Sequence, residues 1–545
     1  MSVELDPVVL GEDRAIMDHI EARLNRFENK NTWWRHDQNG TMDQFDAAFD
    51  AAVEGFKAKL GQKHPLYIGG QAVERDTFET TSPADTSVVV GHWAKGTKED
   101  VREAVRISKE AQPAWAARSW QERAEIIEKA SAFITEHFYD FCAVMTWETG
   151  KTRFEASIDV DEGVDFGYFY AMNYREHGGY DMLMGKPFPN ETCRSIRKPV
   201  GVFGVVCPFN FPVAITFGMA AAALLTGNAA IIKPSMKGCF SGKMVHWALI
   251  SAGVPGEVCH FITGEDAEVG AELLENPDID GLVFTGSKHI GMMALAKQVE
   301  QGRPKPFIAE MGGKNAVLIT KNADLDKAVQ GVYKSAFGFS GQKCSACSRV
   351  YVHRDVADEF LDRLGKLTAA TTIGHPAEKT NFMGPVIEAR KLDLYRDVIE
   401  NVKRDGGTIV TGGNVLADEL GGHYVEPTVV TGLPLDHRVF REEFFMPFAA
   451  VAVVDSLEEA VAEYNKVEYG LTAGVMTEDE DEQQYFFDHV ESGVTYANRA
   501  IGGSTGAVVN GQSFVGWKLS GSTGTGAGGR YYLLQFTRER SQTIA

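Results

Sequence analysis

A cysteine at position 344 stands in the stretch of this chain that is best suited to chemistry. That stretch, residues 335–348, reads SAFGFSGQKCSACS. Its glycines allow tight backbone turns, so we expect Cys344 on a rigid loop or at the start of a helix. Such a placement exposes a thiol and can lower its pKa, which makes it a nucleophile. A free cysteine is also commonly a small buried hydrophobic residue, and this stretch alone leaves both interpretations open.

Two other side chains have the chemistry that a thiol nucleophile requires, an oxyanion donor and a base. Asn210 lies in a predicted strand-to-helix turn, PFNFP, at residues 208–212. Its amide could donate to a developing oxyanion, or it could only satisfy the backbone of its own turn. Glu310 ends an apolar run in FIAEMGGK, residues 307–314. A carboxylate beside a dry cavity has a raised pKa and can serve as a base; the alternative is an exposed carboxylate at a strand end.

Two familiar motifs do not fit their surroundings. Residues 524–529 match the dinucleotide pattern GxGxxG letter for letter, but no predicted strand leads into them and no helix follows, as that pattern requires. The CxxC at 344–347 has no second cysteine pair and no histidines at zinc-ligand spacing, although a redox dithiol stays open. The 14 histidines form no HExxH pair, and no GxxxxGK[ST] phosphate loop occurs. We therefore predict no metal site.

The elements that must position these residues alternate between strands and helices. Such alternation predicts a parallel, doubly wound α/β sheet, which binds ligands beyond the carboxyl ends of its strands. The turn at 208–212, KPS at 233–235 and FTGS at 284–287 each follow a predicted strand. Lys233 could hold a nucleotide hydroxyl or phosphate, or be a surface lysine. The predicted elements are strands 201–207, 229–233, 258–263 and 281–284 and helices 213–225, 238–253 and 266–275.

Alternation resumes after residue 315 and predicts a second α/β domain. Trp33 and Trp34 are expected to anchor a charged, helical N-terminal region on the main body. The acidic run at 478–482 is expected to be a solvated helix start. The remaining expectations are a helix at 120–148 that Gly150 ends, a second helix from 151 toward 170, an arm or hairpin at 178–200, strands 315–320 and 349–353, helices 324–337 and 356–367, and a terminal strand at 530–536.

The composition limits the classes of function. With 54 basic and 75 acidic residues the formal net charge is −21, which argues against nucleic-acid binding and against an anionic membrane surface. Seven cysteines in 545 residues exclude a disulfide scaffold and fit the cytoplasm. The N-terminus lacks a secretory pattern. The longest apolar run, Val213 to Leu225, is too short to span a bilayer.

Several motifs, taken in order, resemble the aldehyde dehydrogenase superfamily. They are PFNFP (208–212), KPS (233–235), FTGS (284–287), EMGGK (310–314), GQKC (341–344) and EEFFMP (442–447). The resemblance covers about residues 65 to 545. Within the superfamily the chain is most similar to the L-glutamate γ-semialdehyde (1-pyrroline-5-carboxylate) dehydrogenase branch. That likeness rests on residues 337–349, on EAS at 155–157, on STGAVV at 504–509 and on KLSG at 518–521.

The resemblance implies a two-step reaction at Cys344. The thiol attacks the aldehyde carbon to give a thiohemiacetal, whose oxyanion is held by the Asn210 side chain and the backbone N–H of Cys344. A hydride passes to the nicotinamide and leaves a thioester, and Glu310 then activates the water that hydrolyses it. The implied function is NAD(P)-dependent oxidation of L-glutamate γ-semialdehyde to L-glutamate in proline breakdown. The alternatives are the same mechanism on a different aldehyde, and a non-catalytic protein that keeps the fold.

The resemblance also implies binding residues and domains. The cofactor, NAD with NADP possible, is expected at Lys233, Ser235, Gly286, Ser287, Glu443 and Phe445, and the substrate at Ser345, Gly506, Ala507 and Glu155. The fold expected is α/β and aldehyde dehydrogenase-like, with a β-flap through which a homo-oligomer forms. The expected divisions are an N-terminal extension at 1–64, an NAD(P)-binding domain at 65–307 with the oligomerisation arm at 178–200, a catalytic domain at 308–500, and an anchor loop and C-terminal oligomerisation strand at 501–545.

Three positions depart from the family pattern. Met236 stands where an acidic residue often follows KPS, which leaves NAD or NADP open. Met446 replaces a usual glycine. The segment 498–505 is a few residues longer than the usual approach to the anchor loop, which leaves the aldehyde open.

Overall fold

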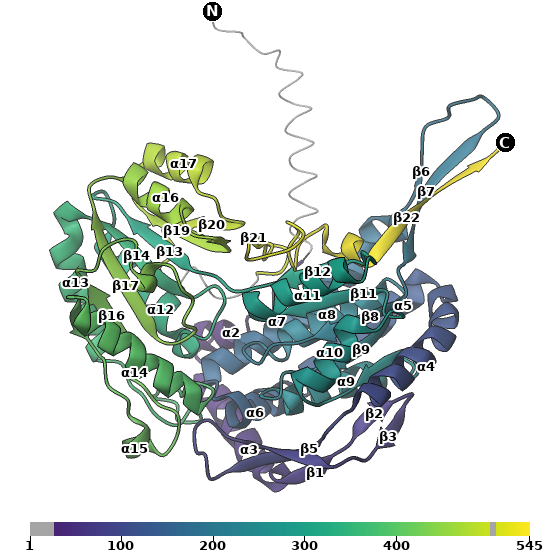
Figure 1. Cartoon of the computed structure of the whole chain (residues 1–545), viewed down its shortest axis with the longest axis horizontal. Helices are drawn as coiled ribbons and strands as arrows, with labels where there is room; N and C mark the ends of the chain where they lie inside the picture. Colours follow the sequence, from purple (N-terminus) through teal and green to yellow (C-terminus); the bar gives the residue numbers. More distant parts are fainter. Residues whose placement is uncertain (1–26, 502–507) are drawn as a thin grey trace, which may run out of the picture.

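Two seven-stranded β-sheets organise the chain into two lobes (Figure 1). The computed structural model describes residues 27–501 and 508–545. The first sheet has the order β12-β11-β8-β9-β10-β2-β3, and its five strands from β12 to β10 are parallel, as predicted. Its strands are β2 (Leu66–Ile68), β3 (Gln71–Val73), β8 (Val202–Val206), β9 (Ala229–Lys233), β10 (Cys259–Phe261), β11 (Gly281–Thr285) and β12 (Phe307–Glu310).

The central strands of this sheet are continuous apolar runs, which need cover on both faces. Helices provide that cover, so the strands are buried on both faces. All five residues of β9 are buried, for example. The helices are α4 (Lys98–Ala117), α8 (Ala214–Leu225), α9 (Cys239–Ser251), α10 (Ala271–Glu275), which follows the π-helical turn η3 (Asp266–Gly270), and α11 (Lys288–Glu300).

The second sheet has the order β15-β16-β17-β14-β13-β19-β20, with only β15 antiparallel. It confirms the predicted second α/β unit. β12 still belongs to the first sheet, so Glu310 ends a strand of the first lobe; the domain limits themselves stay a prediction. The strands are β13 (Asn315–Ile319), β14 (Cys347–His353), β15 (Thr408–Thr411), β16 (Thr428–Thr431), β17 (Phe448–Val454), β19 (Thr472–Met476) and β20 (Val494–Ala497), and the helices are α12 (Leu325–Phe337), α13 (Arg354–Ala369), α14 (Ala389–Arg404), α15 (Ala417–Leu420), α16 (Leu457–Asn465) and α17 (Glu480–His489).

Three consecutive helices, α5 (Trp120–Glu136), α6 (Phe138–Thr149) and α7 (Arg153–Glu176), pack beside the first sheet. The predicted helix at 120–148 is thus two helices, because the backbone of His137 leaves the helical region between them. Gly150 separates α6 from α7 with a φ of 75°. A Cβ there would lie 2.6 Å from the ring of Pro385, so the turn requires glycine.

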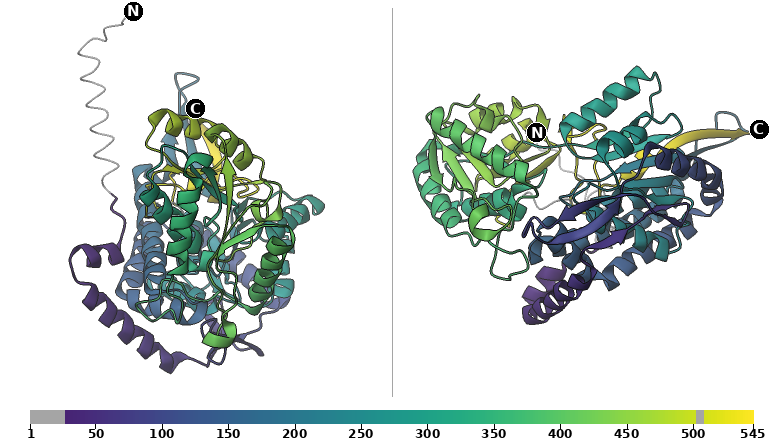
Figure 2. Two further views of the ribbon diagram at one scale, coloured as in Figure 1. Left: turned by 90° about the vertical axis from the view of Figure 1, so that its left-hand side faces the viewer. Right: turned by 60° about the horizontal axis from the view of Figure 1, so that its bottom comes forward.

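An N-terminal strap, residues 27–56, lies outside these helices (Figure 2). It contains α2 (Thr32–Gln38), which packs on α7, and α3 (Met42–Phe56), which packs on α6. Trp33 and Trp34 both contact Phe154 of α7, at centroid distances of 5.6 and 6.0 Å, which confirms them as anchors. The strap is followed by η1 (Lys57–Lys59) and by a three-stranded sheet of β1 (Gln62–His64), β4 (Thr77–Thr81) and β5 (Val89–Ala94).

A three-stranded flap projects from the first lobe (Figure 1). Its order is β22-β7-β6, so the predicted hairpin at 178–200 pairs with the end of the chain. The predicted terminal strand at 530–536 is wrong. That apolar run forms the short 3₁₀ helix η6, whose Tyr532 stacks on Tyr170 at 5.5 Å, and the strand begins after it. The flap elements are η2 (Gly178–Tyr180), β6 (Asp181–Leu183), β7 (Thr192–Pro199), η6 (Tyr532–Phe536) and β22 (Thr537–Ile544).

The segment before this tail crosses between the lobes. β21 (Trp517–Lys518) pairs with β18 (Tyr469–Gly470) of the second lobe. Ser520 and Ser522 then hold the end of β12: the N–H of Met311 donates to Ser520 O at 2.8 Å, and that of Ala309 donates to Ser522 Oγ at 2.8 Å. In the described ranges, no helix combines the length and apolar character that crossing a bilayer needs.

The strap is held to α7 by a buried arginine, whose loss we expect to destabilise the fold. Arg153 donates to Asp46 Oδ1 at 2.9 Å, to Asp50 Oδ1 at 2.5 Å and to the Ala377 carbonyl at 2.6 Å. Arg153→Ala should lower the free energy of unfolding by about 3 kcal/mol, because it removes a buried side chain together with its hydrogen bonds to two carboxylates and a carbonyl. Arg354→Ala, which removes an exposed pair with Asp455, should cost less than about 1 kcal/mol. Urea unfolding measures both, and equal effects would contradict the assignment.

Candidate active site

A strained loop presents Cys344. After α12 ends, Phe339, Ser340 and Gly341 all have positive φ, of 49°, 55° and 67°. Such backbone is costly for the first two residues and persists only where the surroundings hold it. Ser340 Oγ donates to the Gly384 carbonyl at 2.7 Å, and a Cβ on Gly341 would lie 2.3 Å from the Met446 carbonyl. The expected rigid loop is therefore present, and it includes the element η4 (Gly338–Gly341).

The backbone of Cys344 is fixed by Asn315. The side-chain amide of Asn315 donates to the Cys344 carbonyl at 2.7 Å and to the Ala346 carbonyl at 3.0 Å. Gly313 lies so close that a Cβ would come within 2.4 Å of the same Cys344 carbonyl. The sequence reasoning missed Asn315, although it directly follows the GGK motif that ends at Lys314.

The residue Cys344 is partly exposed, and its thiol lies in a crowded, acidic place. Burial raises its pKa, and the charges of Glu443, Glu310 and Glu162 raise it further. The expectation that the loop lowers the thiol pKa is therefore wrong for this state of the protein. Loss of water and three nearby carboxylates outweigh any benefit from the loop. A base must accordingly take the thiol proton before attack.

Glu310 is suited to that proton transfer. It ends β12, where its carbonyl accepts from the N–H of Gly286 at 3.1 Å. Its Oε2 atom is buried and has no hydrogen-bond partner among residues 27–501 and 508–545. Burial alone raises the pKa of this carboxyl well above its usual range. Its charge contributes to the raised pKa of the Cys344 thiol, so the two residues lie within electrostatic reach of each other, and their roles as nucleophile and base stay predictions.

Asn210 occupies the turn between β8 and α8, where it is only 3% exposed. The aromatic residues on either side of it reach other parts of the site. Phe209 packs on Phe445 at 5.9 Å, and the ring of Phe211 lies 3.8 Å from Lys151 Nζ. The same ammonium lies 4.6 Å from the ring of Phe339, in the loop that leads to Cys344. The turn therefore adjoins the cysteine loop, through a lysine that sequence reasoning missed.

The predicted cofactor residues lie at the carboxyl ends of β9 and β11. Lys233 is buried along its stem and pairs with Asp266 at 2.6 Å, whose carboxylate is 79% exposed. Ser287 caps the N-terminus of α11, where its hydroxyl accepts from the N–H of Ile290. Backbone N–H groups at a helix N-terminus suit a phosphate. Together these groups offer a cation, N–H donors and hydroxyl acceptors, which fit the parts of a dinucleotide.

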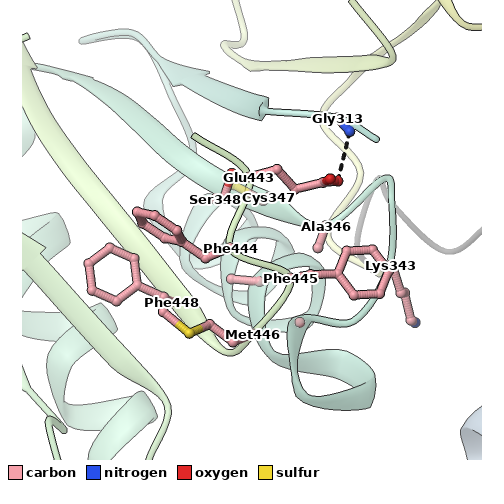
Figure 3. Close-up of a pocket in the computed structure, with 12 residues that line it drawn as sticks. Gly313, Lys343, Ala346, Cys347, Ser348, Glu443, Phe444, Phe445, Met446 and Phe448 are labelled. Carbon is pink, nitrogen blue, oxygen red and sulfur yellow. Dashed lines mark hydrogen bonds between the residues drawn. The ribbon is translucent and has the colours of Figure 1, made fainter. Parts of the chain in front are cut away.

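Glu443 and Phe445 come from the second lobe (Figure 3). Glu443 Oε1 accepts from the N–H of Gly313 at 2.8 Å, and burial raises its pKa to about 7. Phe445 has a φ of 56°, and its ring lies on the Lys343 side of the segment, away from Phe444 and Phe448. Glu443 is therefore held at Gly313, three residues beyond Glu310, on the segment between β12 and β13, and its charge contributes to the raised pKa of Cys344. Its role toward a nicotinamide stays a prediction.

The predicted substrate residues are placed only in part. Ser345 is buried beside Cys344, and Gly506 and Ala507 lie outside the described residues. Glu155 forms a buried ion pair with Lys343 at 2.7 Å, so its carboxylate already has a partner. Its role toward a substrate amino group stays a prediction. Within the described ranges, no group of three or more histidine, cysteine, aspartate or glutamate side chains is placed to hold a metal.

Comparison with known proteins gives this arrangement a context. The family model described as "Aldehyde dehydrogenase family" matches residues 70–542. A Staphylococcus aureus protein named 1-pyrroline-5-carboxylate dehydrogenase is 36% identical over 500 residues, which is 90% of this chain and 95% of that one. A crystal structure of 1-pyrroline-5-carboxylate dehydrogenase from Thermus with bound NAD has a TM-score of 0.87 at 33% identity and covers 91% of this chain and 96% of its own.

A longer protein is similar as well. Proline utilization A from Bdellovibrio bacteriovorus has a TM-score of 0.87 at 32% identity over 91% of this chain, which spans about half (51%) of that chain. The matched model, the two lobes and the cysteine between them agree: the chain belongs to the aldehyde dehydrogenase family.

Proposed function

We propose that this protein oxidises L-glutamate γ-semialdehyde to L-glutamate with NAD, a step of proline breakdown. The observation that carries the proposal is a strained loop that presents Cys344 within electrostatic reach of Glu310, whose buried Oε2 atom lacks a partner in the described residues. The name borne by the Staphylococcus aureus relative supports this aldehyde.

The residues that would hold the cofactor are Lys233, Ser235, Gly286, Ser287, Glu443 and Phe445. A bound nicotinamide supplies the acceptor for the hydride that an aldehyde carbon loses when it is oxidised. Asp266 favours NAD over NADP, because its carboxylate lies 2.6 Å from Lys233 Nζ. An acid at this place accepts from a ribose hydroxyl and repels a 2′-phosphate. Asp266 of η3 thus takes the place of the acidic residue that is absent at position 236, after KPS.

The chain's own residues carry the covalent steps. Cys344 loses its proton to Glu310 and attacks the aldehyde carbon, so that a C–S bond forms and the carbonyl oxygen becomes an oxyanion. The amide of Asn210 and the N–H of Cys344 donate to that oxygen. Oxidation at this carbon leaves a thioester. Glu310 gives up the thiol proton to solvent and then takes a proton from water, the water oxygen attacks the acyl carbon, the C–S bond breaks with Cys344 leaving as a thiolate, and the product acid is released.

The flap supports a homo-oligomer as part of the proposal. β6 and β22 form its two outer strands, and unpaired edges of this kind favour pairing with another chain. Apolar side chains stand exposed on it, including Leu183 at 75%, Phe188 at 65% and Ile544 at 68%. All seven cysteines are free, which supports the cytoplasm as the compartment.

Kinetics across aldehydes and cofactors test the proposed substrate. We expect kcat/KM for L-glutamate γ-semialdehyde with NAD to exceed the values for pentanal and benzaldehyde at least 100-fold. A charged anchor that only this substrate uses gives discrimination of that size. The value of kcat/KM should be higher with NAD than with NADP, and Asp266→Asn should make the two values more similar. A simple aldehyde that is oxidised faster would overturn the substrate and leave the mechanism standing.

Replacing the base should uncouple the two covalent steps. Glu310→Gln should slow turnover about 100- to 1000-fold, because a general base contributes that much. A burst of one NADH per subunit should remain but form more slowly than in the wild type, because water must then take the thiol proton, and the acyl group on Cys344 should be detectable by mass spectrometry. At a pH that ionises Glu310 in the wild type, the variant's thiol should react faster with iodoacetamide than the wild-type thiol, because the charge that raises the pKa of Cys344 is gone. Wild-type turnover should rise with pH as Glu310 loses its proton, and the variant should lack that rise.

The matched controls for this experiment are the two cysteines. Cys344→Ala should abolish the burst, whereas Cys347→Ala, which alters a buried neighbour whose Sγ donates to the Arg349 carbonyl, should keep it. Unchanged steady-state turnover in Glu310→Gln would refute its role as the base.

Deletion of residues 537–545 should reduce the assembly. The deletion removes β22, which pairs with β7 over eight residues. Size-exclusion chromatography with light scattering should show an oligomer for the full chain and a smaller species for the deletion. A full chain that is monomeric would refute the proposed homo-oligomer. A deletion variant that keeps the mass of the full-length assembly would refute the role of β22 in forming it.

A further inference from the structure

Helix α7 has polar contacts on two faces. Toward the active site, Glu155 pairs with Lys343, and Asp159 pairs with Lys151 at 3.0 Å. These contacts lead to the cysteine loop and to the turn that carries Asn210. A shift of α7 therefore moves groups on both sides of the reacting carbon.

The N-terminal strap fixes the outer face of α7 at intervals along its length. Phe27 packs on Phe169 at 5.5 Å. The N–H of Lys30 donates to Asp165 Oδ1 at 3.0 Å. The N–H and hydroxyl of Thr32 donate to the two oxygens of Asp161 at 2.6 and 2.8 Å. The strap therefore runs antiparallel to α7, and its contacts hold both carboxylates, which are less than 10% exposed.

Asn29 joins this strap to a third segment. Its side-chain amide donates to Asp165 Oδ2 at 2.9 Å and to the Val509 carbonyl at 3.0 Å. An amide group has two N–H bonds in a fixed planar arrangement, so the two acceptors are held at a set separation. Val509 is 1% exposed, and its neighbour Asn510 has a φ of 64° and donates its N–H to the Gly528 carbonyl at 3.0 Å. The acceptor side is thus itself well fixed.

We propose that Asn29 is a positioning residue for the substrate, which sets the place of Val509 relative to α7. The inference rests on the proposed function, since Gly506 and Ala507, the predicted ligands of the substrate carboxylate, precede Val509 by only a few residues. Asn29 acts through the backbone that it holds and touches neither cofactor nor reacting atoms. It gives the N-terminal strap a part in substrate recognition, besides its part in stability.

Steady-state kinetics of the full-length protein test this inference. Asn29→Ala should raise KM for L-glutamate γ-semialdehyde by more than twofold and up to about 10-fold, the limit reached if the whole free energy of one net hydrogen bond is passed on to substrate binding. KM for NAD, and kcat/KM for pentanal, which lacks a carboxylate, should change less than about twofold. The matched control is Asn31→Ala, since Asn31 is exposed and its amide only donates to the Asn29 carbonyl at 3.3 Å. The control should behave like the wild type.

A double variant separates positioning from stability. Asn29→Asp with Asp165→Asn keeps an amide–carboxylate hydrogen bond between the two positions, but leaves no N–H for the Val509 carbonyl. It should recover Tm toward the wild-type value and keep the raised KM for the semialdehyde. Recovery of KM together with Tm, or a KM for NAD that rises in step, would overturn the inference and leave a purely stabilising role.

The wild type distinguishes the two levels of the proposal. If it fails to oxidise the semialdehyde, the proposed function falls and the inference falls with it. If it oxidises the semialdehyde and Asn29→Ala keeps the wild-type KM, the inference alone is refuted.

Discussion

The buried ion pair of Lys151 and Asp159 is the constraint on which the active site depends. Both side chains are fully buried, and the ammonium lies against the rings of Phe211 and Phe339. Asp159 Oδ1 also accepts from the N–H of Ala214, at the start of α8. One pair thus joins α7, the Asn210 turn and the cysteine loop. Burying two charges is expensive, and removal of either partner would leave an uncompensated charge inside the protein. The pair therefore penalises every arrangement in which these three segments separate.

The reactive groups near that ion pair have few stabilising contacts. The buried Oε2 of Glu310 has none within the described ranges, the thiol of Cys344 faces three carboxylate charges, and the backbone from Phe339 to Gly341 is left-handed. Each of these features costs stability. Burial makes Glu310 a stronger base, whereas the carboxylates around Cys344 keep its thiol protonated until a base acts. Structural residues nearby are fully paired: Asn315 holds the Cys344 carbonyl, and Ser520 holds the end of β12. The rigidity of these supports makes the unpaired groups tolerable.

The sequence best predicts local secondary structure and the site residues that lie in recognisable motifs. Buried runs such as β9 are recognisable because strands that are covered on both faces read as continuous apolar segments. Cys344, Asn210 and Glu310 are found from motifs at strand ends and loops. Partners distant in sequence are not found: Glu155 meets Lys343 across 188 residues, and nothing near either one signals the other. The prediction of a strand at 530–536 is wrong because these apolar residues are buried against α7 and β8 as a short helix. Length and composition alone do not distinguish a short buried strand from a short buried helix.

Helix α7 shows why such partners escape a periodicity argument. Glu155, Asp159, Asp161 and Asp165 are all buried on it, so it has no polar face in the usual sense. Their partners come from three places in the chain: the cysteine loop (Lys343), the residue after Gly150 (Lys151) and the strap (Asn29, Lys30 and Thr32). Buried apolar residues such as Val160 and Phe169 hold this helix in the core. A rotation about its axis would in addition strand several carboxylates at once. The acids therefore specify one orientation of α7, and through it one placement of the strap relative to the cysteine loop.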